Sequence, residues 1–263
     1  MKDRRLAQSF GAEAAAYEQG RPGYPADAVQ WILAATSPDE LAPAHGQGSN
    51  HPGAAGRVEV VDLGAGTGKF TRALVSEGAE VTAVEPDPQM RERLAVALPE
   101  VTTLAGTAES IPLGAASADL VTMAQAWHWV DPVAASAEIA RVLRPGGVLA
   151  LVWNVRDHRV PWVQALTEVI GASIAEEFDT VHPPLGDPLV RDAFAEFDWR
   201  FPLDRDGMHA LVASRSSVIA LDPPARHELA DRLDKLLDAH PALAGRTGYE
   251  LPYRTRVTLA RRP

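Results

Sequence analysis

Short apolar runs and amphipathic segments alternate along the first 154 residues of the chain. The apolar runs are rich in β-branched residues, as buried strands are, and occupy 58–63, 80–84, 119–124 and 148–153. Between them, helical spacing of apolar residues predicts helices over 68–77, over 88–98 and from Asp131-Pro132, an N-cap residue followed by proline. This alternation predicts a parallel sheet with helices on both faces.

The pattern is looser outside this region. A helix is expected within 24–35, and residues 41–56, rich in Gly, Pro and Ala, are expected to form a flexible loop rather than a domain boundary. Beyond Asn154, apolar spacing predicts one helix around 162–170 and another around 229–237. Residues 254–259 alternate polar and apolar side chains, which is typical of a half-exposed, antiparallel edge strand.

The chemistry of the chain is concentrated at the ends of the first two predicted strands. Gly64, Gly66 and Gly68 follow the first strand at alternate positions, and the second strand ends in Glu85. Glycines let the chain turn tightly and let a ligand lie against bare backbone, and a carboxylate accepts two hydrogen bonds from a ribose diol. The dinucleotide fingerprint requires a further glycine where this chain has Lys69, so the pattern departs from that fingerprint.

The motif Asp62-x-Gly64-x-Gly66-x-Gly68 resembles motif I of the class I S-adenosylmethionine (SAM)-dependent methyltransferases, of the small-molecule, methyltransferase type 11-like kind. Three further segments resemble that family in order: GTAESIPL, DLVTMAQAWHWVD and LRPGGVLALVWN, at 106–113, 119–131 and 143–154. The resemblance implies a doubly wound, Rossmann-like α/β fold with seven strands. It implies a mostly parallel sheet, an antiparallel edge strand and a small helical cap.

The resemblance also implies which residues hold SAM. Tyr17 and Arg21 belong to an N-terminal segment that folds over the cofactor in relatives, where the planar Arg21 fork would match the SAM carboxylate; the alternative is a packing tyrosine and a solvated arginine. Ala108 and Glu109 would flank the adenine, and Gln125 would meet the SAM ammonium. The expected cofactor-binding residues are Tyr17, Arg21, Asp62, Gly64, Ala65, Gly66, Gly68, Glu85, Pro86, Met90, Ala108, Glu109 and Gln125.

Aromatic residues follow the fourth and fifth predicted strands, at the sheet edge where open α/β folds bind ligands. Trp127, Trp129, Trp153 and Asn154 are expected to line a pocket for the methyl acceptor, with core packing as the alternative for the indoles. His128 is the candidate general base, since its unperturbed pKa lies near 6.5. The alternative is a histidine held by a backbone hydrogen bond.

Composition narrows the function further. The 263-residue chain has no cysteine, which excludes disulfides, thiolate metal sites and thiol nucleophiles, and its net charge of −10 disfavours a nucleic-acid substrate. No apolar run reaches the length of a membrane span or a signal peptide, so a cytoplasmic protein is expected. The histidines lack metal-ligand spacing, and no metal is expected.

We therefore expect a single methyltransferase domain, with a cofactor lid and first helix in 1–35, a SAM-binding core in 57–154, and C-terminal strands and an acceptor cap in 155–263. The expected reaction is in-line transfer of the SAM methyl group to O, N or C of a small molecule. Two alternatives stay open. One is a methyltransferase for RNA, DNA or protein, although the N/D-P-P-Y motif is replaced by Ala124-Gln125-Ala126-Trp127. The other is a non-catalytic binder of SAM or a dinucleotide.

Overall fold

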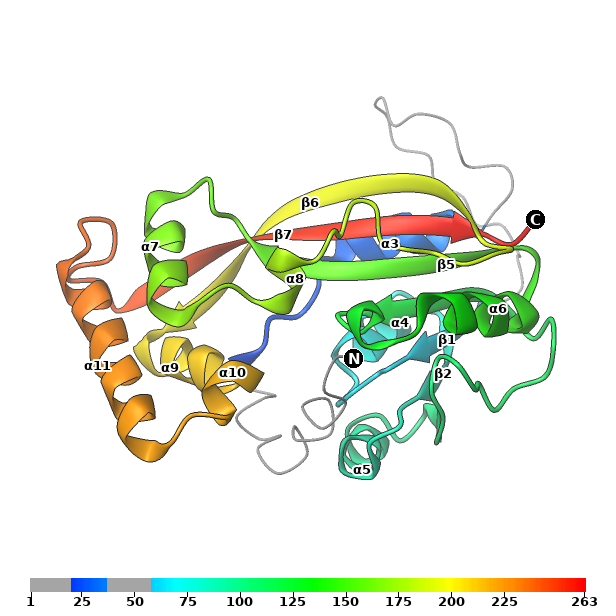
Figure 1. Ribbon diagram of the computed structural model, residues 1–263, viewed down its shortest axis with the longest axis horizontal. Coiled ribbons are helices and arrows are strands. Elements are labelled where there is room, and N and C mark those ends of the chain that lie inside the picture. The colour runs from blue at the N-terminus through cyan, green and yellow to red at the C-terminus, as the bar shows by residue number, and fades with distance from the viewer. Residues whose placement is uncertain (1–19, 37–57) are drawn as a thin grey trace.

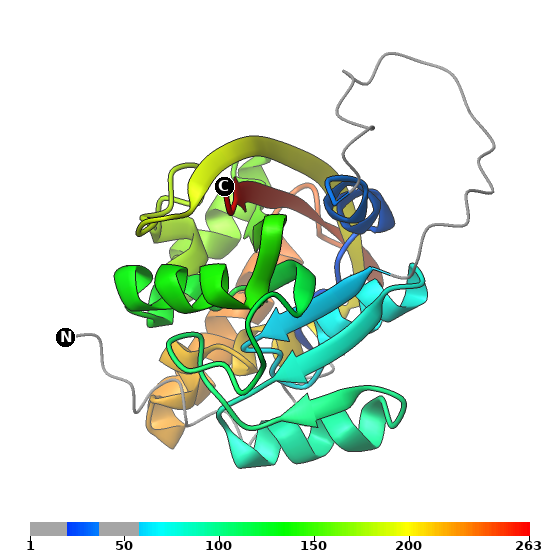
Figure 2. The same cartoon turned by 90° about the vertical axis from the view of Figure 1, so that its right-hand side faces the viewer.

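The computed structural model of the protein describes residues 20–36 and 58–263. The predicted loop at 41–56 and the cofactor candidate Tyr17 lie outside the described residues. Within them the chain forms one α/β unit in which a twisted sheet is covered by helices on both faces (Figures 1 and 2).

The sheet has seven strands in the order β3-β2-β1-β4-β5-β7-β6. Strands β1 to β5 pair in parallel, and β7 runs antiparallel to both of its neighbours. The fold expected from the sequence is confirmed. The antiparallel strand predicted at 254–259 is β7, which lies one position inside the edge because β6 covers its outer side. The strands are β1 (Glu59–Leu63), β2 (Glu80–Val84), β3 (Thr102–Leu104), β4 (Ala118–Ala124), β5 (Leu143–Arg156), β6 (Val190–Asp204) and β7 (Gly248–Arg261).

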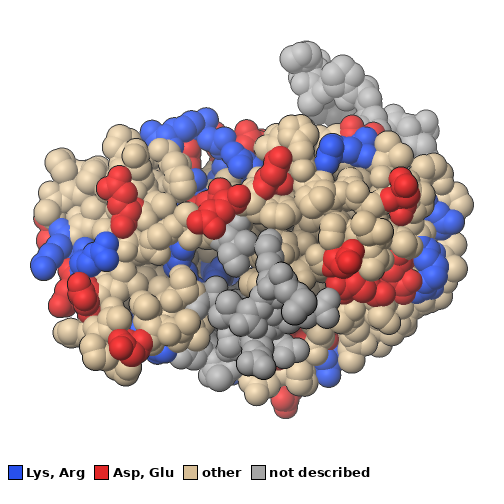
Figure 3. All heavy atoms as spheres, viewed as in Figure 1, with Lys and Arg blue, Asp and Glu red and all other residues tan. Residues whose placement is uncertain are grey.

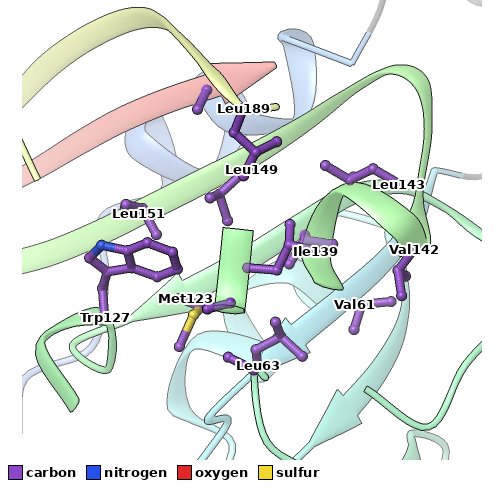
Figure 4. Close-up of a cluster of buried hydrophobic side chains, with 14 of the residues drawn as sticks. Val61, Leu63, Met123, Trp127, Ile139, Val142, Leu143, Leu149, Leu151 and Leu189 are labelled. Atoms are coloured by element: carbon purple, nitrogen blue, oxygen red, sulfur yellow. The ribbon is translucent and has the colours of Figure 1, made fainter. Parts of the chain in front are cut away.

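Alternation along the strands builds a separate core on each face of the sheet. On β5, Val148, Ala150 and Val152 pack with helices α3 (Ala26–Ala34) and α4 (Lys69–Ser76). Leu149, Leu151 and Trp153 point to the opposite face and pack with α6 (Pro132–Val142) (Figure 4). A strand that is buried on both faces reads as a continuous apolar run, which explains the sequence of β5.

Helix boundaries follow from local side-chain chemistry. Asp131 accepts hydrogen bonds from the amides of Val133 and Ala134, as expected for the N-cap of α6. Asp87 caps α5 (Pro88–Ala97) in the same way. Strand β5 begins five residues before the predicted run, because Leu143 pairs with Ala118 ahead of a register shift. The Arg-Pro-Gly-Gly segment that ends α6 is therefore accommodated as an irregularity at the start of the strand.

The C-terminal helices build a second body on an extension of the sheet. Strands β6 and β7 stay paired from Val190 and Arg261 to Asp204 and Gly248, whereas β5 pairs with β7 only as far as Arg156. Helices gather on this overhang at one end of the molecule (Figure 1) and enclose an apolar cluster around Trp162, Leu233 and Leu251. We call this body the cap. Its helices are α7 (Pro161–Ile170), α9 (Arg205–Ala213), α10 (Ser216–Ile219) and α11 (Pro223–Ala239). Helix α8 (Ile174–Glu177) packs against β5 instead, with Ala175 in the core on the α6 face.

Asp62 joins three elements beneath the glycine-rich turn. The carboxylate, only 1% exposed, accepts hydrogen bonds from the hydroxyls of Thr71 on α4 (2.7 Å) and Thr122 on β4 (2.8 Å). Burial raises the pKa of Asp62 from 3.8 to about 6, against the opposing effect of the two hydroxyl donors. The motif I acid thus acts within the protein as a junction between β1, α4 and β4.

This raised pKa makes stability depend on pH in a definite direction. The folded protein binds the Asp62 proton more tightly than the unfolded chain, so the contribution is fully present below pH 3.8 and is lost as the pH rises through about 6. The side chain of the Asp62→Asn variant stays neutral, so the variant does not lose this stability as the pH rises. The difference in unfolding free energy, variant minus wild type, should therefore rise by about 2–3 kcal/mol between about pH 4 and pH 7, as measured by urea unfolding.

Asp27→Asn, at an exposed position on α3, is the control and should follow the wild-type pH profile. An unchanged difference between Asp62→Asn and wild type over the whole range would show that the Asp62 carboxyl does not titrate there.

Candidate active site

A cavity of about 230 Å³ opens where β1, β4 and β5 end. The glycine-rich turn after β1 lines one end of the cavity. Its middle is lined by Gln125, His128, Trp129 and Asn154, and its other end by Arg156, Glu176 and Arg215. Parallel strands bring their carboxyl ends to one edge of the sheet, which is where open α/β folds bind ligands. Strand β7 runs the other way, so an early residue of that strand, Tyr253, pairs with Arg156 and reaches the same cavity.

The three glycines of the turn have different neighbours, although all have positive φ, at 65°, 59° and 89°. A Cβ on Gly64 would lie 2.9 Å from Ala126 Cβ, and one on Gly68 would lie 3.0 Å from Leu94 Cγ. A Cβ on Gly66 would meet only Met90 Sδ, at 3.8 Å. Gly64 and Gly68 are therefore required by protein packing, whereas Gly66 presents bare backbone to the cavity.

Glu85 fixes the shape of this turn. Its Oε2 accepts a hydrogen bond from the Gly66 amide and its Oε1 one from the Asp87 amide, both at 2.8 Å. Burial raises the pKa of Glu85, while the two amide donors lower it. Each carboxylate oxygen has a second acceptor position beyond its amide donor. Glu85 is thus oriented by the backbone and carries spare acceptor capacity.

Six of the expected cofactor residues are absent from the cavity lining as the described residues define it: Gly68, Glu85, Pro86, Met90, Ala108 and Glu109. Ala108 is buried in the core on the α6 face. Glu109 Oε1 accepts a hydrogen bond from the Asp131 amide at 3.1 Å, and the exposed Pro86 accepts one from Arg91 through its carbonyl. By contrast Arg21, Asp62, Gly64, Ala65, Gly66 and Gln125 line the cavity.

Gln125 and Asn154 connect the middle of the cavity to the N-terminal segment. Gln125 is a non-glycine residue with a φ of 59°, and its Nε2 donates to the Asn154 carbonyl at 3.1 Å. The Asn154 side chain donates to the Gly23 carbonyl at 2.8 Å and accepts from the Thr255 hydroxyl at 2.6 Å. Because these groups bond within the protein, Asn154 positions residues around the cavity and has little capacity left to contact an acceptor.

The expectation that three indoles line an acceptor pocket requires correction for two of them. Trp127 is 2% exposed, donates through Nε1 to the Pro184 carbonyl, and packs in the core on the α6 face (Figure 4). Trp153 is fully buried in the same core, because the alternation of β5 turns it toward α6. Trp129, half-buried, lines the cavity.

His128 also lines the cavity and is 8% exposed. Its ring centroid lies 4.8 Å from Trp129 and 6.1 Å from Phe178. The position is suited to a group that meets an acceptor, and a role as general base stays a prediction.

A buried ion pair at the cap end of the cavity was not predicted from the sequence. Arg156 donates from Nε and Nη2 to the two oxygens of Glu176, each at 2.7 Å, and the two side chains are only 3% and 5% exposed. Burial acts to raise the pKa of Glu176, but the bonds and charge of Arg156 prevail and lower it to about 2. An arginine two positions beyond Asn154 could have signalled a ligand-edge residue, whereas the partner 20 residues later lies in a segment without a regular pattern.

The described residues contain no candidate metal site and no helix that could span a membrane. Residues 20–36 and 58–263 contain no group of three His, Asp or Glu side chains suited to hold a metal ion. None of the helices in those ranges is long and apolar enough to cross a membrane.

The strand order, the glycine-rich turn after β1 and the acid that ends β2 together define the class I methyltransferase fold. Comparison with known proteins agrees with this assignment. Residues 61–151 match the family model of the methyltransferase domain. An uncharacterized methyltransferase of Mycobacterium tuberculosis is 45% identical over 260 residues, which cover 98% of each chain.

More distant relatives extend over almost the whole chain as well. An uncharacterized methyltransferase-like protein of Schizosaccharomyces pombe is 31% identical over 256 residues, covering 94% of this chain and 93% of that one. A solved structure of a proposed type II methyltransferase from Anaeromyxobacter dehalogenans has a TM-score of 0.59 at 27% identity, covering 92% and 96%. The chain belongs to the class I SAM-dependent methyltransferase family.

The placement of the tryptophans leads to a stability test. Trp127→Ala removes a fully packed indole from the core and should cost about 3–5 kcal/mol of unfolding free energy. Trp129→Ala, at a half-buried position beside the cavity, should cost much less. Urea unfolding of the two variants measures both values, and equal losses would contradict the placement of Trp127 in the core.

Proposed function

We propose that this methyltransferase binds SAM on the glycine-rich turn and transfers its methyl group to a small molecule held between that turn and the cap. The observation that carries the proposal is the continuity of the cavity. It runs from Gly66 past Gln125 and Trp129 to Arg156 and Arg215 of the cap end. One cavity therefore extends from the cofactor motif to the residues at the base of the cap.

Features of the turn fit the proposed cofactor. The hydroxyl of Thr67 is buried, lines the cavity and has no hydrogen-bond partner among the described residues. Buried polar atoms without a partner are rare in folded proteins, so a ligand with a polar group is expected to complete this site. The open space over Gly66 admits the cofactor against the backbone, and Glu85 offers acceptors for a ribose diol.

The residues around the cavity would act chiefly by positioning. SAM supplies an electrophilic methyl group on a sulfonium. Arg21 would hold the cofactor carboxylate, and Gln125 would be held in its left-handed conformation by the bond to the Asn154 carbonyl. Trp129 would keep water from the reacting atoms. Holding two reactants in line supplies much of a rate enhancement, and His128 would be needed as a base only for an acceptor protonated at neutral pH.

The size of the cavity and the charge of the protein surface favour a small acceptor over a polymer. A cavity of about 230 Å³ admits a small molecule but not a folded chain. The net charge is −10, and on the described part of the face drawn in Figure 3 acidic and basic side chains are interspersed. Nucleic-acid binding relies on clustered Lys and Arg that neutralise phosphates.

Calorimetry with SAM, its demethylated product S-adenosylhomocysteine (SAH) and NAD tests the cofactor assignment. SAM and SAH should bind, and NAD should not. Gly66→Val should weaken SAH by more than about a hundredfold, because the side chain fills the space that the cofactor requires. NAD binding without SAH binding would refute the proposal.

Gly78→Val is the matched control for Gly66→Val. Gly78 also has a positive φ, 87°, and open space around it, but it lies at the end of α4 outside the cavity lining. Both variants carry the same kind of backbone strain, about 1–2 kcal/mol, so a difference in SAH affinity isolates the site. Equal affinities in the two variants would place the cofactor elsewhere.

Glu85→Ala tests the role of the acid that ends β2. The substitution removes the ribose acceptor and releases the Gly66 amide, so cofactor affinity should fall by about 1.5–3 kcal/mol, or roughly 10- to 150-fold. Glu80→Ala, at the exposed start of the same strand, is the control and should bind SAH as wild type does. A Glu85→Ala protein with wild-type affinity would exclude Glu85 from the cofactor site.

A further inference from the structure

The Arg156 guanidinium has one nitrogen without a bonding partner. Its Nε and Nη2 bond to Glu176, and Nη2 also donates to the Gly171 carbonyl at 3.0 Å. Nη1 is buried and has no hydrogen-bond partner among the described residues, although the side chain is only 3% exposed and lines the cavity. A buried cationic donor that is left without an acceptor is costly, so this nitrogen marks a place for an acceptor from outside the protein.

A second guanidinium lies at the same end of the cavity. Arg215 lines it from the turn that precedes α10, and its Nη2 donates to the carbonyls of Gly171 (3.0 Å) and Ala172 (2.7 Å). Burial and, after it, the positive charge of Arg156 lower the pKa of Arg215 to about 10, while the charge of Glu176 acts to raise it. Both arginines also donate to the Gly171 carbonyl, each at 3.0 Å, so the two guanidinium groups lie close together.

The charges at this end do not balance. Among the described residues at this end, Arg156, Arg215 and Arg21, which donates to the Ser214 carbonyl at 3.0 Å, carry three positive charges against the one negative charge of Glu176. The proposed function assigns Arg21 to the cofactor carboxylate, which leaves an excess of one positive charge on Arg156 and Arg215. Arg156 is held by Glu176 and the Gly171 carbonyl, and Arg215 by the carbonyls of Gly171 and Ala172, so both are preorganised and lose little side-chain entropy when a ligand binds. A site of this kind binds a planar monoanion in a fixed orientation.

We propose that Arg156 and Arg215 form an anion subsite that holds a carboxylate of the methyl acceptor. The proposal rests on the proposed function, because the subsite lies beyond the cofactor turn in the same cavity. A single carboxylate matches the excess charge of one, whereas a dianionic phosphate would exceed it. The acceptor is therefore a small carboxylic acid whose charged group is directed into the cap end of the cavity.

Titration calorimetry on SAH-saturated protein tests this subsite. The probes are succinate, benzoate and citrate, each compared with its uncharged amide, and inorganic phosphate. At least one carboxylate should bind about tenfold or more tightly than its amide. In Arg215→Gln that carboxylate should bind about tenfold more weakly, and Arg215→Lys should restore part of the affinity.

Arg156 is tested by the double variant Arg156→Gln/Glu176→Gln, because removing the arginine alone would leave a buried carboxylate without its partner. Urea unfolding establishes that the double variant is folded, and it too should lose carboxylate affinity. Arg232→Gln, an exposed arginine on α11 outside the cavity lining, is the control and should match wild type.

The possible results distinguish a failure of the anion subsite from a failure of cofactor binding. Normal SAH binding with no carboxylate preferred over its amide, or with equal carboxylate binding in wild type and Arg215→Gln, would overturn the subsite. Tighter binding of phosphate than of every carboxylate would overturn the choice of anion. Failure of wild type to bind SAH would instead overturn the proposed function itself.

Discussion

The hydrogen bond from the Gly66 amide to Glu85 joins the turn after β1 to the end of β2, and the cofactor end of the cavity depends on it. The turn cannot be held by side-chain packing, because Gly66 has none and its two glycine neighbours are used to avoid Ala126 and Leu94. A carboxylate that accepts backbone amides fixes the loop without filling the space above it. The buried Asp62 supports the same turn from below, through α4 and β4.

At the other end of the cavity the constraint is electrostatic. Arg156 and Glu176 are buried together, and each is stabilised by hydrogen bonds to the other and to nearby backbone. The bonds of Glu176 to Arg156 and to the Ser173 amide hold α8 against the end of β5, so the wall of the cavity and the ion pair form together. Nη1 of Arg156 is not used by this ion pair and has no hydrogen-bond partner among the described residues. The same side chain therefore stabilises the wall of the cavity and offers a donor to a ligand.

The sequence predicts the sheet core well, because β1, β2, β4 and β5 are buried on both faces and their apolar runs are continuous. Strand β6 was missed, although Ala195, Phe197, Trp199, Phe201 and Leu203 alternate with polar residues or proline in a period of two. The site was predicted where a motif is local, as at Gly66 and Glu85. It was not predicted where distant segments meet, as at Arg156, Glu176 and Arg215, since no spacing in the chain links them. Trp127 and Trp153 were misplaced because aromatic residues near a sheet edge serve cores as readily as pockets.

The overhang of β6 and β7 beyond β5 gives the molecule a modular construction. In the described part of the chain, the apolar cluster inside the cap shares no residue with the clusters beneath the glycine-rich turn. Helices α7 and α11 can therefore be repacked, lengthened or replaced on the paired strands without disturbing the hydrogen bond between Gly66 and Glu85 that shapes the cofactor end. The end of α9 is more constrained, because the Ser214 carbonyl accepts a hydrogen bond from Arg21 at 3.0 Å. Arg156 and Tyr253, at the base of the overhang, belong to the shared sheet and also line the cavity. In this architecture the acceptor specificity can change through substitutions in the cap, while the residues that shape the cofactor end stay the same.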